Sequence, residues 1–184
     1  METLILFIIA LGLAMDCFTL AISNSSVSGL VKAGVPLKVA IAFTFAHLVW
    51  LYAGHWLGGA IQSYFAGMES WAAFVVLGII GLKMIYEARR RHPGSKVFDI
   101  NDVRVIVVLS LATAMNAFLA GVALGLTAMP VHRGGLLVAI SVFVLSLGGM
   151  AGGKNLGLLY ARRTAYFGGS FMLMASAIFL SQIL

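Results

Sequence analysis

The segment Leu11-Gly-Leu-Ala-Met-Asp-Cys-Phe18 returns 100 residues later as Leu111-Ala-Thr-Ala-Met-Asn-Ala-Phe118, with Leu, Ala, Met and Phe in register. A weaker match follows between Val39-Ala-Ile41 and Val138-Ala-Ile140. Chance similarity between two apolar helices is the alternative explanation. The spacing instead predicts a chain built from two copies of one unit.

The surrounding sequence is that of a membrane protein. Hydrophobic residues make up 61% of the chain and charged residues 10%, whereas a soluble domain has about 45–50% and about 25%. At about 20 residues per crossing, 184 residues hold six spans. Strand-like alternation is absent, so we expect an all-α membrane protein with six transmembrane helices, in one domain over residues 1–184. The uninterrupted apolar runs are Thr3–Ser23, Leu37–Ile61, Trp71–Tyr86, Val103–Thr127, Leu136–Gly152 and Ala165–Leu184.

Three spans in each copy have a topological consequence. Repeat one would cover residues 1–88, a cytoplasmic linker residues 89–102, and repeat two residues 103–184. Because three is odd, the second copy would enter the membrane from the opposite side. Inverted-topology repeats of this kind are common in secondary transporters, and their substrate site lies near the midplane where the halves meet.

Positive charge is concentrated in alternate loops. The second and fourth loops hold Arg133 alone, while the first, third and fifth hold ten of the twelve basic residues. An excess of Lys and Arg marks the cytoplasmic side, so both termini should lie outside. This topology accounts for the net charge of +6, and no nucleic-acid partner is expected. The ten residues are Lys32, Lys38, Arg89, Arg90, Arg91, Lys96, Arg104, Lys154, Arg162 and Arg163.

Asp16 is the main candidate for a functional residue. An ionisable group at the bilayer centre costs roughly 2.5–3.5 kcal/mol and persists only with a partner or a wet cavity. With Gly12, Thr19 and Ser23 it forms a small, polar face, and Asn116 is its counterpart in the second copy. We expect the two side chains to meet as a ligand site. The alternative is a hydrogen bond that only joins two helices.

Other candidates surround this pair. His47 could bind a metal or carry a proton, or simply bond a neighbouring helix. Met15 and Met115 flank the polar pair, and their thioethers would favour a transition metal, although methionine is more often a gap-filler. Lys83 lies deep in its span with Glu87 one turn away, so Lys83 could snorkel to the surface or act as a counter-ion for Asp16.

Small residues recur at a spacing of four, a pattern that lets helix backbones approach closely. Gly12 belongs with them as a packing residue, and Gly152-Gly153 could bend or end the fifth run. The other helix-packing glycines are Gly54, Gly58, Gly121, Gly125, Gly149 and Gly153.

No nucleophile–base pair occurs at reactive spacing, so we do not expect an enzyme.

Several of these segments resemble one known family. The Ala-Met-Asp-x-Phe core ending at Phe18, its echo ending at Phe118, Trp71-Ala-Ala-Phe-Val75 and Gly81-Leu-Lys-Met-Ile-Tyr-Glu87 are similar to the MntP-type manganese efflux pumps, within the LysE-like exporters. The resemblance implies a bacterial inner-membrane exporter of Mn²⁺, with no permanently bound cofactor. Its partners would be the metal ion, protons and lipid, with a homodimer possible.

The sequence departs from that family at two positions. Asn116 stands where the family usually has Asp, and His47 where it tends to have Glu. A shell of Asp, Asn, His and Met can still bind Mn²⁺, Fe²⁺, Co²⁺ or Zn²⁺, but it is softer and less anionic.

Energetics favour a coupled exporter. Moving a dication out against an inside-negative potential costs about 4.6 kcal/mol per 100 mV, so proton antiport is expected. Asp16 would alternate between metal and proton, with His47 or Lys83 as the second titrating group. Two alternatives stay open: export of a small organic cation or amino acid, and a non-transporting structural or developmental membrane protein of the same fold.

Overall fold

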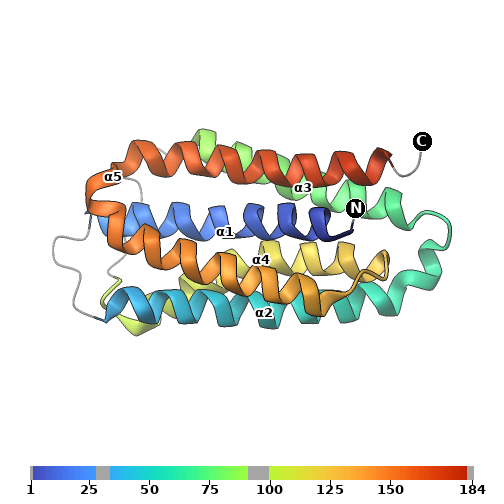
Figure 1. Cartoon of the computed structure of the whole chain (residues 1–184), viewed down its shortest axis with the longest axis horizontal. Helices are drawn as coiled ribbons and strands as arrows, with labels where there is room; N and C mark the ends of the chain where they lie inside the picture. The colour runs from blue at the N-terminus through green and yellow to red at the C-terminus, as the bar shows by residue number, and fades with distance from the viewer. Residues whose placement is uncertain (1, 28–33, 91–99, 182–184) are drawn as a thin grey trace.

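The computed structural model describes residues 2–27, 34–90 and 100–181, and within these ranges the chain is helical, without strands (Figure 1). Six stretches are long and apolar enough to cross a membrane, which confirms the predicted fold class. Most of the predicted linker at 89–102 lies outside the described residues. The elements are α1 (Glu2–Val27), α2 (Val35–Ile61), the 3₁₀ helix η1 (Gln62–Phe65), α3 (Glu69–Arg90), α4 (Val103–Leu126) and α5 (Val131–Ser181).

The fifth and sixth spans are two halves of α5, separated by a kink at Gly157. Gly157 has φ 70° and ψ 171°, a conformation that residues with a Cβ rarely adopt. The fifth span ends at Gly153, where the sequence suggested a bend or an end, although the helix itself continues to Gly157. The predicted start at Leu136 was wrong, because the helix begins at Val131. Polar residues such as Arg162 end an apolar run, but helical hydrogen bonds continue through them.

All six spans lie along one axis, with α1 and α4 the most deeply buried of them (Figure 1). The N-terminal end of α1 and the C-terminal end of α5 share one end of the bundle. The opposite end, which we call the basic end, holds Lys38 in the first turn of α2, Arg89 and Arg90 in the last turn of α3, and Arg104 in the first turn of α4.

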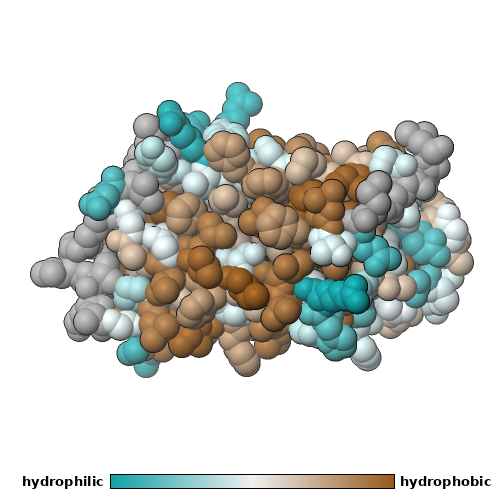
Figure 2. Space-filling view, in the orientation of Figure 1, coloured by the Kyte–Doolittle hydropathy of each residue, from teal (hydrophilic) through white to brown (hydrophobic). Residues whose placement is uncertain are grey.

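Apolar side chains cover the middle of the face drawn in Figure 2, and hydrophilic ones lie toward its two ends. Large apolar residues on several helices are exposed, among them Phe45, Leu136 and Phe167, each more than 60%. In a soluble protein such a belt would mark an interaction surface. On six membrane-spanning helices it is the surface that faces lipid.

Glycines bring α2 into backbone contact with α4. A Cβ at Gly54 would fall on the carbonyl oxygen of Phe118, and a Cβ at Gly121 on that of Leu51. Small residues at such crossings allow the close packing on which helix association in lipid depends. The prediction that Gly54 and Gly121 are packing residues is consistent with these contacts.

The same kind of contact recurs elsewhere at fixed sequence offsets. The contacts that Gly54 and Gly58 of α2 make with α4 have counterparts between the first half of α5 and α1, with the glycine shifted by 95 positions and its partner by 100. Where α3 crosses the second half of α5, the two matching contacts lie in the same crossing. Here the glycine and its partner are each shifted by 88 positions. The matching pairs are Gly54 with Phe118 and Gly149 with Phe18, Gly58 with Val122 and Gly153 with Ile22, and Gly81 with Leu173 and Gly169 with Ile85.

Adding a methyl group at these crossings should destabilise the bundle. We expect Gly54→Ala and Gly121→Ala to lower the free energy of unfolding by about 1–3 kcal/mol, because the backbones cannot separate without losing contacts. A Cβ at Gly59 or Gly148 would meet nothing within 4 Å, so Gly59→Ala and Gly148→Ala are matched controls. Thermal midpoints of the detergent-solubilised variants measure the difference, and equal midpoints in the two pairs would contradict this packing account.

Candidate functional site

Asp16 of α1 and Asn116 of α4 are in direct contact in the middle of the bundle. The Asn116 side-chain amide donates to Asp16 Oδ2 over 3.0 Å, and the two residues are only 7% and 4% exposed. At 1.5 Å per residue, Asp16 lies about 21 Å from the start of α1 and Asn116 about 20 Å from the start of α4. Both are therefore near the midplane of a core about 30 Å thick.

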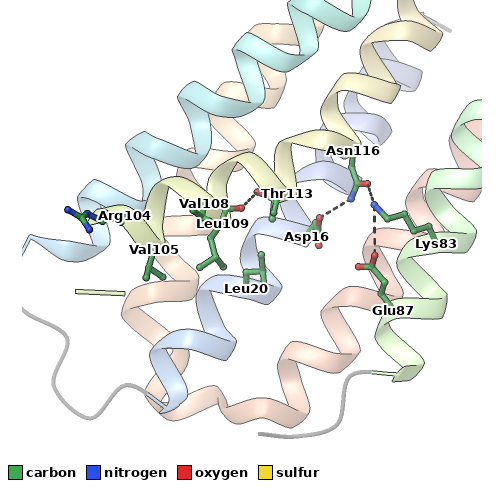
Figure 3. Close-up of a pocket in the computed structure, with 11 residues that line it drawn as sticks. Asp16, Leu20, Lys83, Glu87, Arg104, Val105, Val108, Leu109, Thr113 and Asn116 are labelled. Carbon is green, nitrogen blue, oxygen red and sulfur yellow. Dashed lines mark hydrogen bonds and ion pairs between the residues drawn. The ribbon is translucent and has the colours of Figure 1, made fainter. Parts of the chain in front are cut away.

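Lys83 and Glu87 of α3 extend this contact into a chain of four polar side chains (Figure 3). Lys83 Nζ donates to Asn116 Oδ1 over 3.0 Å and lies 3.9 Å from Glu87 Oε1. The side chains of Lys83 and Glu87 are 43% and 42% exposed. The structure thus brings together four of the predicted site residues, from three helices.

A cavity of about 460 Å³ runs from these four polar side chains to the basic end of the bundle. Asp16 and Asn116 line it near the midplane, and Arg104 lines it about 18 Å away along α4. Thr113 and Leu20 lie between these limits, as Figure 3 shows. The buried carboxylate therefore lies beside a space that reaches one membrane surface.

The side chains that line the cavity offer oxygen atoms as ligands. Asp16 and Glu87 contribute carboxylates, Asn116 an amide oxygen and Thr113 a hydroxyl. Within residues 2–27, 34–90 and 100–181, no three His, Cys, Asp or Glu side chains gather closely enough to hold a metal ion. A cation bound here would need the amide, the hydroxyl and water beside a carboxylate. The charges of Asp16, Glu87, Lys83 and Arg104 sum to zero.

His47, Met15 and Met115 do not line this cavity. His47 is fully buried, with Nδ1 2.8 Å from the Phe43 carbonyl oxygen and Nε2 3.4 Å from the Cys17 thiol. Because a carbonyl only accepts, Nδ1 carries the proton and Nε2 accepts from the thiol. Met115 is 45% exposed on the surface of α4.

Sequence reasoning did not place Arg104 in the site, because it counted Arg104 only as a loop charge. Stepping back from Asn116 four residues at a time leads to Ala112, Val108 and Arg104, all of which line the cavity. Residues at this spacing share one face of a helix. Extending the polar face of α4 to its first turn would have found the mouth of the cavity.

A second hollow of about 380 Å³ lies at the other end of the bundle. Its lining includes two carboxylates, Glu2 and Glu69, and the side chain of Phe179, which is otherwise fully buried. On α1, between Glu2 and Asp16, Ile9 and Leu13 are at most 1% exposed. Packed apolar side chains thus lie on α1 between this hollow and the polar chain at the midplane.

Comparison with known proteins gives one consistent result. A family model described as "Putative manganese efflux pump" matches residues 31–180. A protein of Methanoregula boonei named "Putative manganese efflux pump MntP" is 32% identical over 184 residues, which is 100% of this chain and 99% of that protein. Proteins with the same name in Methanothermobacter thermautotrophicus and Crocosphaera subtropica are 30% and 28% identical, over 95% and 100% of this chain and 93% and 98% of theirs. No solved structure matches.

A cysteine in the cavity should react from one side of the membrane only. Ala112 lines the cavity and is exposed, whereas Leu13 is fully buried. In membrane vesicles we expect Ala112→Cys to be labelled by a charged, impermeant thiol reagent from the side that carries Arg104, and Leu13→Cys to stay unlabelled. The wild-type chain, whose only cysteine is buried, sets the background. Equal labelling of Ala112→Cys from both sides would disprove a one-sided cavity.

Proposed function

The chain belongs to the Mntp family, and we propose that it exports a divalent transition-metal cation, Mn²⁺ foremost, from the cytoplasm across the inner membrane. The observation that carries the proposal is the buried contact between Asp16 and Asn116 at the inner limit of the cavity. An intramembrane carboxylate is costly to keep and marks ion pathways. Relatives named as manganese efflux pumps supply the identity of the metal.

The ligand atoms support manganese over softer metals. The cavity presents carboxylate, amide and hydroxyl oxygens, and oxygen ligands with water suit Mn²⁺, whereas imidazole and sulfur ligands suit Zn²⁺ and copper. His47 and Met115, which would favour softer ions, lie away from the cavity. We therefore propose Asp16 and Asn116 as the metal ligands closest to the midplane, with Thr113 and water completing the shell.

An inverted repeat would give this site access to both sides of the membrane. The contacts that recur at offsets of 100, 95 and 88 positions support two copies of a three-helix unit. In Figure 1, α1 and α4 run in opposite directions, as an inverted pair must. We propose that the copies rock around the contact between Asp16 and Asn116, as the halves of such transporters do.

The charges at the basic end support an orientation. The cavity reaches Arg104, and Arg89 and Arg90 lie at the same end. By the positive-inside rule this end faces the cytoplasm, both termini lie outside, and the cavity is open to the cytoplasm. Glu2 and Glu69 would then line the exit on the outer side. Ile9 and Leu13 belong to the apolar layer that must separate before the ion leaves.

Export against an inside-negative potential needs a source of energy, and we propose proton antiport. A dication costs about 4.6 kcal/mol per 100 mV to expel. Asp16 can hold either a metal ion or a proton. When the empty site returns to the cytoplasmic side, a proton on Asp16 would neutralise its charge.

A small organic cation is a second candidate substrate. The cavity volume of about 460 Å³ falls within the range of about 300–1,000 Å³ that is usual for small-molecule sites. An ammonium group could bind Asp16 without other metal ligands. Competition by cationic amino acids for Mn²⁺ flux into proteoliposomes separates the two candidates.

Asp16→Asn should lower metal export by about tenfold or more while leaving the fold intact. It removes the charged ligand but keeps the shape of the side chain, and a lost charged interaction of about 1.5–3 kcal/mol corresponds to a fall in flux of about tenfold or more. Asp102→Asn is the matched control, because Asp102 caps α4 and Asn is an equally good cap. Mn²⁺ flux in proteoliposomes measures both variants. Unchanged flux in Asp16→Asn would remove this residue from the mechanism.

Asn116→Asp should tighten metal binding. It places a second carboxylate where the amide nitrogen now lies 3.0 Å from Asp16, so two like charges repel until a dication binds between them. We expect Mn²⁺ affinity to rise by about tenfold, and Mn²⁺ to raise the thermal midpoint of the variant more than that of the wild type. Asn101→Asp, outside the cavity lining, is the control for added charge. Calorimetric titration with Mn²⁺ checks the affinity.

A further inference from the structure

Lys83 occupies a position that a bound cation would need. We propose that Lys83 is a tethered competitor of the transported ion: its ammonium group occupies the amide oxygen of Asn116 when no ion is bound, moves to Glu87 when an ion arrives, and expels the ion by returning. This inference rests on the proposed function, since it assigns the step that loads and empties the same site.

The hydrogen bonds of Asn116 lead to this conclusion. Its amide nitrogen donates to Asp16, and its amide oxygen accepts from Lys83 Nζ over 3.0 Å. Only the oxygen of an amide can bind a metal ion. That oxygen has two lone pairs, but a dication and the Lys83 ammonium group would repel each other strongly if both were bound to it. Binding of the ion therefore favours withdrawal of Lys83.

Glu87 provides the place to which Lys83 can withdraw. It lies one turn further along α3, and its carboxylate is already 3.9 Å from Nζ. Both side chains line the cavity, so the ammonium group moves through the cavity and not through lipid. The four-carbon stem of lysine is flexible enough for such a shift.

Charge gives the exchange its direction. With Lys83 in place, a positive charge is linked to the Asp16 carboxylate through the Asn116 amide, and an ionised group near the midplane needs such a partner. A dication carries twice the charge of the ammonium group and can displace it, whereas a monovalent ion has no such advantage. Once the site is open to the outer side, the returning ammonium group weakens the binding of the ion to Asn116.

A static cross-link between α3 and α4 predicts something different. In that case any change at Lys83 would loosen the bundle and lower transport without tightening binding. Competition instead predicts that removal of Lys83 tightens binding and slows release, so that KM and kcat both fall. Loss of Glu87 should have the opposite effect on KM, because Lys83 then stays on Asn116.

The experiment measures Mn²⁺ flux in proteoliposomes and Mn²⁺ binding by calorimetry for the wild type, Lys83→Gln, Glu87→Gln and Lys83→Arg. For Lys83→Gln we expect Kd and KM to fall by about tenfold and kcat to fall by at least as much. For Glu87→Gln we expect KM to rise by about tenfold. Lys83→Arg keeps the charge and the donors, so it should restore much of the wild-type kcat.

Arg104→Gln is the control for charge alone. It removes one positive charge from the same cavity about 18 Å from Asn116, so it should shift KM much less than Lys83→Gln. Equal shifts in these two variants, or shifts of KM in the same direction in Lys83→Gln and Glu87→Gln, would overturn the competitor role while Asp16-dependent flux still supports the proposed function. A wild-type protein that neither binds nor transports Mn²⁺ would overturn both.

Discussion

A carboxylate in the middle of a lipid bilayer must have a partner, and this constraint organises the whole molecule. Asp16 meets it through the amide of Asn116 and the cavity beside them. Because the partner lies on α4, two helices far apart in the sequence must lie side by side at the midplane. The ammonium group of Lys83 donates to the oxygen atom of the same amide.

The helix packing makes this arrangement possible. Backbone contacts at Gly54 and Gly121 hold α2 against α4, and those at Gly149 and Gly153 hold the first half of α5 against α1. Further hydrogen bonds join α1 to both halves of α5: the hydroxyls of Thr19 and Thr164 are 2.9 Å apart, and Ser25 donates to the Met150 carbonyl over 2.7 Å. Close contacts thus hold α2 against α4 and α5 against α1. They leave room for the cavity beside Asp16 and Asn116.

Much of this could be predicted from residue types and spacing. Six apolar runs predict six spans, and an acid and an amide 100 residues apart within matching segments predict two polar groups that face each other. The kink at Gly157 could not be predicted in this way, because other glycines nearby offer the same freedom and tertiary packing decides among them. Helix ends were misplaced for a related reason, since helices extend beyond their apolar runs.

The environment of individual side chains was harder to predict than their depth. His47 lies deep in α2, as expected, yet it turns toward Cys17 and not into the cavity. Met115 adjoins Asn116 in sequence but points to the outer surface. Rotation of a helix about its own axis decides both cases, and that rotation depends on all the neighbouring helices together. Pattern within one helix gives the shared face but not what the face contacts.

The most direct test of the account is the position of manganese in the folded protein. Anomalous scattering at the manganese edge, from crystals of the full chain grown with Mn²⁺, should place the ion between the Asp16 carboxylate and the Asn116 amide oxygen, with the Lys83 ammonium group displaced toward Glu87. A peak beside His47 and Cys17, or at Glu2 and Glu69 with the bond from Lys83 to Asn116 intact, would contradict it.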